Sequence, residues 1–254
     1  MITGVRMARN ESVLIADDDV RYDETALRDI LAHLDYAELV RPQNRFDPVP
    51  WHARLDTARI LLNRVGTGDR LFPVGDFPGT FALRRSAFLA CDAYDGDVLF
   101  ENLELMRTFA AAGGRVRTTL GTYVDRMPPE TAHFWSQRVR QAYDDLAIPL
   151  RFAALLSILP LGAVLLVRHR YGSLAAGAAI TVLAAERGRR RAHGRARFPA
   201  SSALLAPVWL GERTVSCWLA LACRLRGGVR YAGGRIRTSA NSVETLRGRR
   251  LGSL

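Results

Sequence analysis

The sequence is poor in two residue types that define many protein classes. It has only three cysteines, Cys91, Cys217 and Cys223, and their spacing fits neither a metal-ligand motif nor a disulfide framework. It has no lysine, so every one of the 36 basic residues is an arginine. Its N-terminus has no apolar core, so we expect no cleaved signal peptide there, and no internal repeat is visible. These absences argue against a disulfide-stapled scaffold, a cysteine-based zinc protein and a repeat protein.

Charge is divided unevenly along the chain. Residues 1–145 carry 18 arginines and 22 acidic residues, a net charge of −4, whereas residues 146–254 carry 18 arginines and 3 acidic residues, a net charge of +15. Such an asymmetry is typical of a basic part that meets nucleic acid or an anionic membrane surface. Because the positive charge accompanies long apolar segments and no soluble recognition motif, the pattern favours a membrane and not nucleic acid.

The first half is organised around residues 12–20, Ser-Val-Leu-Ile-Ala-Asp-Asp-Asp-Val. The apolar run predicts a buried strand, and we expect 13–16 to be a central strand of a parallel sheet. Asp17, Asp18 and Asp19 follow at its carboxyl end, where open α/β sheets place their ligands, and three adjacent carboxylates favour a countercharge. Since Mg²⁺ and Mn²⁺ take carboxylate and phosphate oxygens, the stretch predicts a metal–diphosphate site. A solvated acidic turn is the alternative.

Further helices and strands are expected to follow in alternation. Hydrophobic patterning predicts helices over about 25–34, 51–65, 101–112 and 130–145, and strands over 37–41, 80–83 and 115–120, the last at an edge of the sheet. Residues 42–50, with their proline, asparagine and aspartate, are predicted to form a loop. The alternation predicts an α/β domain over residues 1–145.

A second acidic segment, residues 95–105, leads into the third of these helices. Its carboxylates, Asp97 and Glu101 among them, lie near the helix N-terminus, where negative charge stabilises a helix. The same side chains could act as the general base of a transfer reaction, a role that Asp and Glu often fill. Both interpretations stay open at this point.

The 130–145 helix combines polar and aromatic residues. Gln137 and Arg140 are three residues apart and therefore share a face. Phe134, Trp135 and Tyr143 are of the kind that lies at the headgroup depth of a membrane. The helix is therefore predicted to lie at a membrane interface.

Apolar segments dominate the second half. Residues 146–167 are apolar except for Arg151 and are long enough to span a bilayer. Residues 171–185 form a shorter run rich in alanine and glycine that can pack closely on this segment. Residues 187–197 contain six arginines and should stay on the cytoplasmic side.

The remaining segments are less regular. Residues 203–223 are apolar but carry Glu212 and Arg213 at their centre, so an interfacial or re-entrant segment is as reasonable as a span. Residues 224–254 are predicted to form a basic tail with a small hairpin and a loose C-terminal end.

The order of these motifs resembles that of the membrane-bound glycosyltransferases of family 2, in particular their ceramide-glucosyltransferase-like relatives. An Asp triplet after a strand, an acidic segment, Gln-x-x-Arg on an interfacial helix and then membrane segments follow one another over about residues 1–230. The resemblance implies an α/β fold, with a partial GT-A-like (Rossmann-like) sheet domain followed by α-helical membrane segments. It also implies transfer of a sugar from a nucleotide-sugar donor to a lipid acceptor, with a divalent cation, Mg²⁺ or Mn²⁺.

The resemblance gives roles to individual residues. Asp17, Asp18 and Asp19 match the family's Asp-x-Asp motif, so that Asp19 and Asp17 would bind the metal and Asp17 and Asp18 the donor. Gln137 and Arg140 match the Gln-x-x-Arg-Trp motif, in which Gln141 here replaces the tryptophan, and they would hold the diphosphate.

The general base is implied by a further match. The family's catalytic Glu-Asp pair falls on Glu101 and Asn102, and an asparagine cannot accept a proton as a carboxylate does. Glu101 or Asp97 is therefore expected to be the catalytic carboxylate.

The resemblance divides the chain into three parts: a partial GT-A domain (1–145), a membrane region (146–223) and the basic C-terminal tail (224–254). We expect a multi-pass protein of the cell membrane with the catalytic domain on the cytoplasmic side. The family's first strand and its nucleotide-binding carboxylate have no counterpart before the Asp triplet, so we expect the chain to correspond to the C-terminal portion of such an enzyme. A non-catalytic, truncated membrane protein derived from such an enzyme is the alternative.

Overall fold

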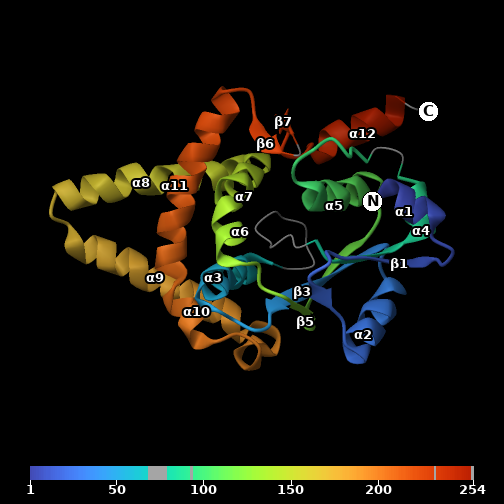
Figure 1. Ribbon diagram of the computed structural model, residues 1–254, viewed down its shortest axis with the longest axis horizontal. Coiled ribbons are helices and arrows are strands. Elements are labelled where there is room, and N and C mark those ends of the chain that lie inside the picture. The colour runs from blue at the N-terminus through green and yellow to red at the C-terminus, as the bar shows by residue number, and fades with distance from the viewer. Residues whose placement is uncertain (68–78, 92–93, 232, 253–254) are drawn as a thin grey trace.

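The computed structural model describes residues 1–67, 79–91, 94–231 and 233–252 (Figure 1). The first half of the chain contains the sheet. Its elements, in order, are α1 (Ile2–Met7), β1 (Ser12–Ile15), β2 (Val20–Arg21), α2 (Glu24–Leu34), β3 (Leu39–Phe46), α3 (Trp51–Gly66), β4 (Phe81–Arg84), α4 (Arg85–Leu89), α5 (Glu101–Ala111) and β5 (Val116–Arg126).

The second half is helical apart from one small hairpin. Its elements are α6 (Thr131–Ser136), α7 (Arg138–Asp144), η1 (Asp145–Ala147), α8 (Pro149–Val167), α9 (Tyr171–Arg190), η2 (Arg191–Ala196), α10 (Ala200–Leu204), α11 (Ala206–Leu225), β6 (Val229–Tyr231), β7 (Gly234–Ile236) and α12 (Val243–Gly252). The hairpin that the sequence predicts after residue 224 is confirmed as the antiparallel pair β6–β7. The chain is therefore a mixed α/β protein.

In the described ranges the sheet has five strands, in the order β1-β4-β3-β5-β2, and only the β3–β5 pair is parallel. The prediction that 13–16 is a central parallel strand is wrong. The strand β1 lies at an edge and pairs antiparallel with β4 alone, from Ser12 opposite Arg84 to Ile15 opposite Phe81. The side chain of Leu14 is 42% exposed, because only Val13 and Ile15 face the packed side of the sheet.

The strand β3 runs further than its sequence indicates. Residues 42–46 were expected in a loop, yet they continue the strand along β5, with a shift of register between Pro42 and Gln43. Polar side chains are tolerated there because they find buried partners: Gln43 accepts a hydrogen bond from Arg64 Nη1 at 2.8 Å, and Asn44 Nδ2 donates to Thr80 Oγ1 at 2.8 Å. As a result β5 pairs with both β3 and β2, and the expectation that it is an edge strand is wrong.

Helices cover both faces of the sheet (Figure 1). On one face, α2 packs Ala26, Ile30 and Leu34 against Val40 and Ala82. On the other, one cluster of buried residues joins α1, α4 and α5 to the strands, and its members are Val5, Leu39, Phe81, Leu83, Phe88, Cys91, Leu105 and Phe109. The packing of helices on both faces of the sheet thus positions the residues that follow β1 and the first residues of α5.

The C-terminal segment is held against α5 and the residues before it, so the expectation of a loose end is wrong for the part that the structure describes, which ends at residue 252. The backbone N–H groups of Leu99 and Phe100 donate to the carbonyl oxygens of Thr238 and Ser239 at 3.0 and 2.7 Å. Leu246 of α12 is fully buried. Its burial supplies the free energy that orders this end of the chain.

The predicted helix over 130–145 is present but interrupted at Gln137, which separates α6 from α7. The Ser136 hydroxyl donates to the carbonyl oxygen of His133 at 2.8 Å, and such a bond competes with the helical pattern. Arg140 still reaches Gln137, as the predicted spacing requires.

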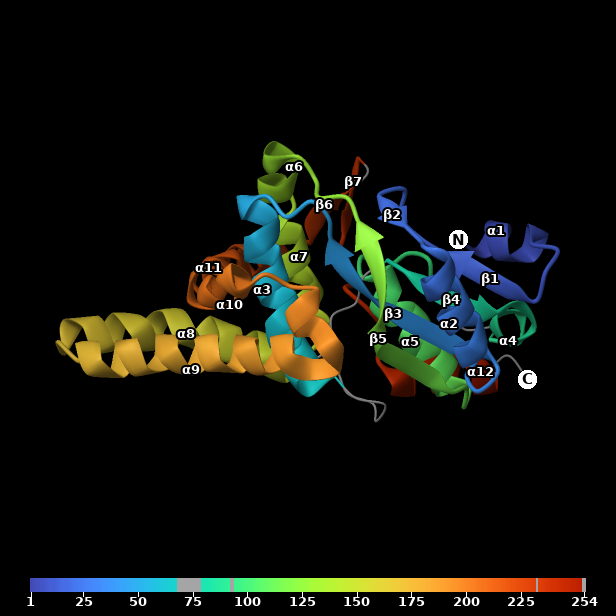
Figure 2. The ribbon, with the colours of Figure 1, turned by 90° about the horizontal axis from the view of Figure 1, so that it is seen from below.

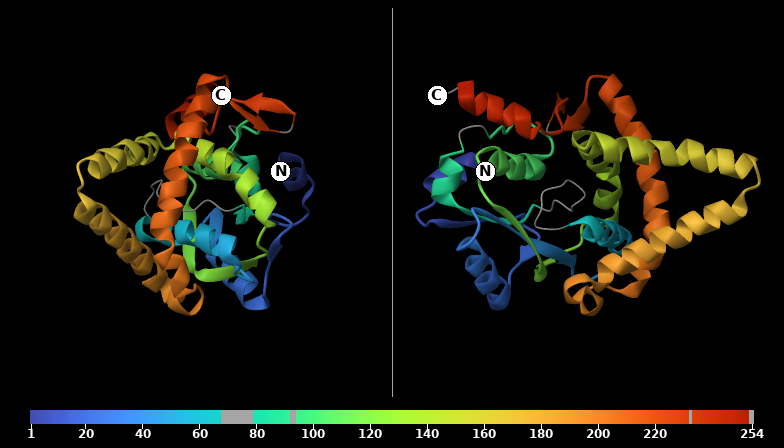
Figure 3. Two further views of the ribbon diagram at one scale, coloured as in Figure 1. Left: turned by 60° about the vertical axis from the view of Figure 1, so that its left-hand side comes forward. Right: turned by 180° about the vertical axis from the view of Figure 1, so that it is seen from behind.

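The helices α8 and α9 leave the body of the molecule as a hairpin, and α11 crosses between them where they enter the body (Figure 2 and Figure 3). Among the described residues, one helix is long and apolar enough to span a membrane, and it is α8. Its most apolar stretch has a mean hydropathy of 2.2, and 11% of that stretch is buried inside the protein. The segment predicted as interfacial or re-entrant is the continuous helix α11, whose Arg213 is only 4% exposed. Of the predicted membrane segments, therefore, one meets the length and apolarity of a span, and the others are not confirmed.

Candidate functional site

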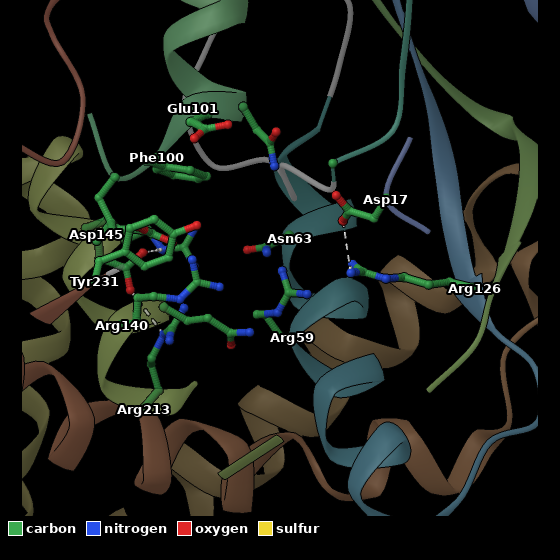
Figure 4. Close-up of a pocket in the computed structure, with 16 residues that line it drawn as sticks. Asp17, Arg59, Asn63, Phe100, Glu101, Arg126, Arg140, Asp145, Arg213 and Tyr231 are labelled. Carbon is green, nitrogen blue, oxygen red and sulfur yellow. Dashed lines mark hydrogen bonds and ion pairs between the residues drawn. The ribbon is translucent and has the colours of Figure 1, made fainter. Parts of the chain in front are cut away.

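A cavity of about 320 Å³ lies between the sheet domain and the helical half. Its described lining comes from the segments that follow β1 and precede β4 and α5, from α3, α5, β5, α7, η1, α8 and α11, and from the β6–β7 hairpin. The lining residues are Asp17, Arg59, Asn63, Gly79, Leu99, Phe100, Glu101, Asn102, Arg126, Arg140, Gln141, Asp144, Asp145, Arg151, Arg213 and Tyr231. Figure 4 shows Asp17 and Arg126 on one side of the cavity and Arg140, Arg213 and Tyr231 on the other. Charged residues therefore face one another across it.

The sheet side of the cavity carries the carboxylates that follow β1. Arg126, at the end of β5, donates from Nε to Asp19 Oδ2 at 2.7 Å and from Nη2 to Asp17 Oδ2 at 3.1 Å. Partial burial raises the pKa of Asp17, and Arg126 opposes that shift. The countercharge expected beside the Asp triplet is thus supplied by an arginine of the protein.

Asp17 and Asp19 could bind a divalent cation only if a further ligand, such as a phosphate, completed its coordination shell. Asp19 Oδ1 is buried and accepts no hydrogen bond from any described residue, and a Cβ on Gly79 would lie 2.6 Å from Asp17 Oδ2. The Asp19 oxygen is therefore available to a cation, and the absence of a side chain at Gly79 lets the Asp17 carboxylate pack directly against the backbone there. Within the described ranges, however, no group of three or more His, Cys, Asp or Glu residues could hold a metal ion. One or two carboxylates are sufficient for Mg²⁺ when phosphate oxygens complete its shell, so the residues fit a metal–phosphate complex and not a metal alone.

The opposite side of the cavity is basic. Arg140 Nε donates to Gln137 Oε1 at 2.7 Å, and its guanidinium lies 5.3 Å from the centre of the Tyr231 ring. Both contacts hold the Arg140 side chain in one orientation. Arg59 of α3, which pairs with Asp56 at 3.0 Å, lines the same cavity.

A buried ion-pair network supports this basic side. Asp145 pairs with Arg213 at 3.1 Å and with Arg151 at 3.2 Å. Arg213 is 4% exposed, and its Nη1 has no hydrogen-bond partner among the described residues. Arg213 is also part of the cavity lining, so its positive charge favours an anionic ligand there.

Two carboxylates of the described lining, Glu101 and Asp144, take part in none of these ion pairs. Glu101 is exposed at the start of α5. Asp144, at the end of α7, is partly exposed as a residue, but its Oδ1 is buried and accepts no hydrogen bond from a described residue. Burial raises the pKa of Asp144 to about 7. Its carboxyl group therefore changes charge near neutral pH.

The cavity brings together three of the residues singled out from the sequence: Asp17, Glu101 and Arg140. Asp18 and Asp19 lie next to Asp17 but do not line the cavity, and Gln137 reaches it only through Arg140. Asp97 does not line the cavity either, so the structure does not bring it to the other candidate residues.

Several candidate functional residues belong to no motif that could be recognised in the sequence. Arg59 and Arg126 are isolated arginines without a motif, and Asp144 and Asp145 are two charged residues at the end of an amphipathic helix. One signal could have found the last pair: adjacent carboxylates directly before a long apolar segment are costly unless they are paired or protonated.

Comparison with known proteins gives no family assignment, because no family model matches the chain and no curated protein is significantly similar to it. The site must therefore be interpreted from its own chemistry.

Proposed function

We propose that this protein is a membrane-associated glycosyltransferase that moves a sugar from a nucleotide-sugar to a lipid acceptor. One observation carries the proposal: a single charged cavity contains Asp17, Glu101 and Arg140, which belong to three separate motifs of the glycosyltransferase resemblance. A sheet domain with helices on both faces is compatible with the GT-A-like domain that the resemblance implies.

The donor diphosphate is assigned to the basic side of the cavity. Arg140, Arg59 and Arg213 border the same space, and guanidinium groups bind phosphate oxygens through paired hydrogen bonds. Gln137 contributes by fixing Arg140. Asp17 faces the same space from the sheet side and can accept hydrogen bonds from the sugar or ribose hydroxyls, whereas Asp18 lies outside the lining.

The Asp17–Asp19 pair is assigned to the metal-bound end of the diphosphate. Arg126 orients both carboxylates. A divalent cation held there, Mg²⁺ or Mn²⁺, would stabilise the negative charge on the departing diphosphate.

The lipid acceptor is assigned to the side of the apolar helices. Arg151, in the first turn of α8, lines the cavity, so the lining continues directly into the candidate span. The α8–α9 hairpin exposes a row of large apolar side chains: Leu159, Leu161, Val164, Leu166, Val167, Tyr171, Ile180 and Leu183. Exposed apolar surface of this extent is typical of membrane contact.

The proposed orientation places the sheet domain on the cytoplasmic side. The arginine-rich segment 187–197, which begins in the last turn of α9, packs on the sheet domain: Arg64 Nε donates to the Gly188 carbonyl oxygen at 3.1 Å, and Tyr123 Oη donates to the Ala192 carbonyl oxygen at 2.6 Å. Both parts therefore lie on one side of the membrane, and arginine-rich short segments resist translocation.

The proposal is tested with the full chain in lipid nanodiscs, labelled nucleotide-sugars, a polar-lipid extract and Mg²⁺ or Mn²⁺. We expect label to enter the lipid fraction. Asp17→Asn and Arg140→Gln should each lower transfer at least about tenfold, since one hydrogen bond to a charged group contributes about 1.5–3 kcal/mol. Asp29→Asn, an exposed change on α2, is the matched control and should leave transfer unchanged. If no donor labels any lipid, the alternative of a non-catalytic membrane protein replaces the proposal.

A further inference from the structure

Asp144 has an unusual position for a carboxylate. It is the last residue of α7, and it lines the cavity beside Arg140 and Asp145. Its Oδ1 is buried without a hydrogen-bond donor among the described residues. A buried carboxylate oxygen with no donor costs free energy, so its position calls for a ligand or a proton.

The other carboxylates of the cavity have different surroundings. Asp17 is held by Arg126 at 3.1 Å, and Asp145 is shared by Arg213 and Arg151. The oxygens of both carboxylates thus already face guanidinium groups, whereas Asp144 forms no ion pair with any described residue. Glu101 is exposed to solvent, whereas the bond-forming step of a transfer reaction is favoured where water is excluded.

Asn102 adds a second, independent reason to look for a base elsewhere. It lines the same cavity, and its amide has no proton-accepting oxygen comparable to a carboxylate. The transfer nevertheless requires that the acceptor hydroxyl lose its proton.

We propose that Asp144 is the catalytic base that deprotonates the acceptor hydroxyl, an assignment that rests on the proposed glycosyl transfer. The hydroxyl oxygen forms a bond to the anomeric carbon of the donor sugar, and its proton passes to the Asp144 carboxylate. The bond from that carbon to the diphosphate oxygen breaks at the same time, and its electron pair leaves with the diphosphate. The glycoside, the nucleoside diphosphate and a protonated Asp144 result.

The charges around Asp144 suit this role. Burial disfavours its ionised form, Asp145 on the following turn adds to that effect, and Arg140, Arg213 of α11 and Arg59 of α3 oppose it. The outcome is a pKa of about 7. A base whose pKa lies near the working pH combines a large ionised fraction with a strong tendency to take up a proton.

The assignment predicts a pH dependence. The ionised carboxylate is the active form, so kcat/KM for transfer by the wild-type chain should rise with pH through about 7 and then level off.

The test compares wild type, Asp144→Asn and Asp29→Asn in the nanodisc assay, over a series of pH values. We expect Asp144→Asn to lower kcat by about 10²–10⁴, the range that positioned proton transfer contributes, to change the KM for the donor little, and to lose the rise near pH 7. Asp29→Asn, exposed on α2, should retain both the rate and the rise. A merely structural role of Asp144 would lower the rate without removing the rise.

The experiment distinguishes failure of the Asp144 assignment from failure of the proposed glycosyl transfer. Transfer by Asp144→Asn within about threefold of wild type, or a slow variant that keeps the rise, overturns the assignment while glycosyl transfer stands. A wild-type profile without a rise near pH 7 overturns it as well, whether or not the variant folds. If the wild type transfers no sugar, the proposed function fails and the assignment fails with it.

Discussion

The close packing of α9 on α3 gives the sharpest prediction for stability. A Cβ built on Gly188 would lie 1.9 Å from the Leu61 carbonyl oxygen and 2.9 Å from its carbonyl carbon. Both are backbone atoms of α3, so no side-chain rotation can relieve the overlap. A carbon–oxygen contact needs about 3.3 Å, and Gly188→Ala must therefore move α9 away from α3 by about 1.4 Å.

The displacement would also break buried hydrogen bonds. The fully buried Arg64 donates from Nε to the Gly188 carbonyl oxygen at 3.1 Å and from Nη2 to the Arg191 carbonyl oxygen at 2.6 Å. Overpacking costs about 1–3 kcal/mol, and the loss of a hydrogen bond to a charged group costs about 1.5–3 kcal/mol. Alanine regains about 1 kcal/mol of helix propensity, so the net loss of stability should be about 1.5–5 kcal/mol.

The measurement is thermal unfolding of the purified chain in detergent. For a chain of this size we expect the melting temperature of Gly188→Ala to fall by roughly 3–20 °C, at about 2–4 °C per kcal/mol. Gly177→Ala is the matched control: it lies on the same helix, and nothing is within 4 Å of its Cβ, so it should melt at or above the wild-type temperature. A Gly188→Ala protein that melts like wild type would refute the close approach of the two helices.

Three further predictions concern charged and small residues at the cavity and behind it. Asp56→Asn should lower the unfolding free energy by about 3–5 kcal/mol in chemical denaturation, because it leaves the buried Arg138 guanidinium without its 3.3 Å carboxylate partner. Gly79→Ala should weaken nucleotide-sugar binding roughly tenfold in calorimetry, since its methyl group displaces the Asp17 carboxylate, while the melting temperature changes little. For Asp144 the folded-state pKa of about 7 lies above its ordinary value of 3.8, so its contribution to stability is fully present below about pH 4 and is lost as pH rises through about 7. Asp144→Asn should therefore melt at a higher temperature than wild type at pH 8 but not at pH 4, and equal differences at the two pH values would refute the raised pKa.

The sequence predicted local structure correctly where that structure depends only on residues close together in the chain. The spacing of Gln137 and Arg140 places both on one side of a helix, and they are hydrogen-bonded in the structure. Glycine pairs flanking Val229–Tyr231 predicted the β6–β7 hairpin, because glycine adopts the positive φ angles that Gly227, Gly228 and Gly233 have. The long run that is apolar except for Arg151 predicted α8 as a candidate span.

The predictions that proved wrong concern segments whose structure depends on contacts with residues far away in the sequence. The run Val13–Ile15 has the composition of a central strand, but its place at the sheet edge depends on pairing with β4, almost seventy residues later. Polar residues of β3 suggested a loop, because the sequence does not reveal that Arg64 and Thr80 satisfy them in the interior. The C-terminal residues likewise gave no sign that α5 would hold them.

The sequence by itself determined the charged motifs, the division of charge between the two halves and the local helices, because each depends on residue type and short spacing. Only the tertiary structure decided which charges share a cavity. Asp144 and Arg126 have no motif, and their roles follow from burial and from partners that other elements supply. Electrostatic free energy depends on distance and solvent exposure, and neither can be calculated from residue order until the chain has folded.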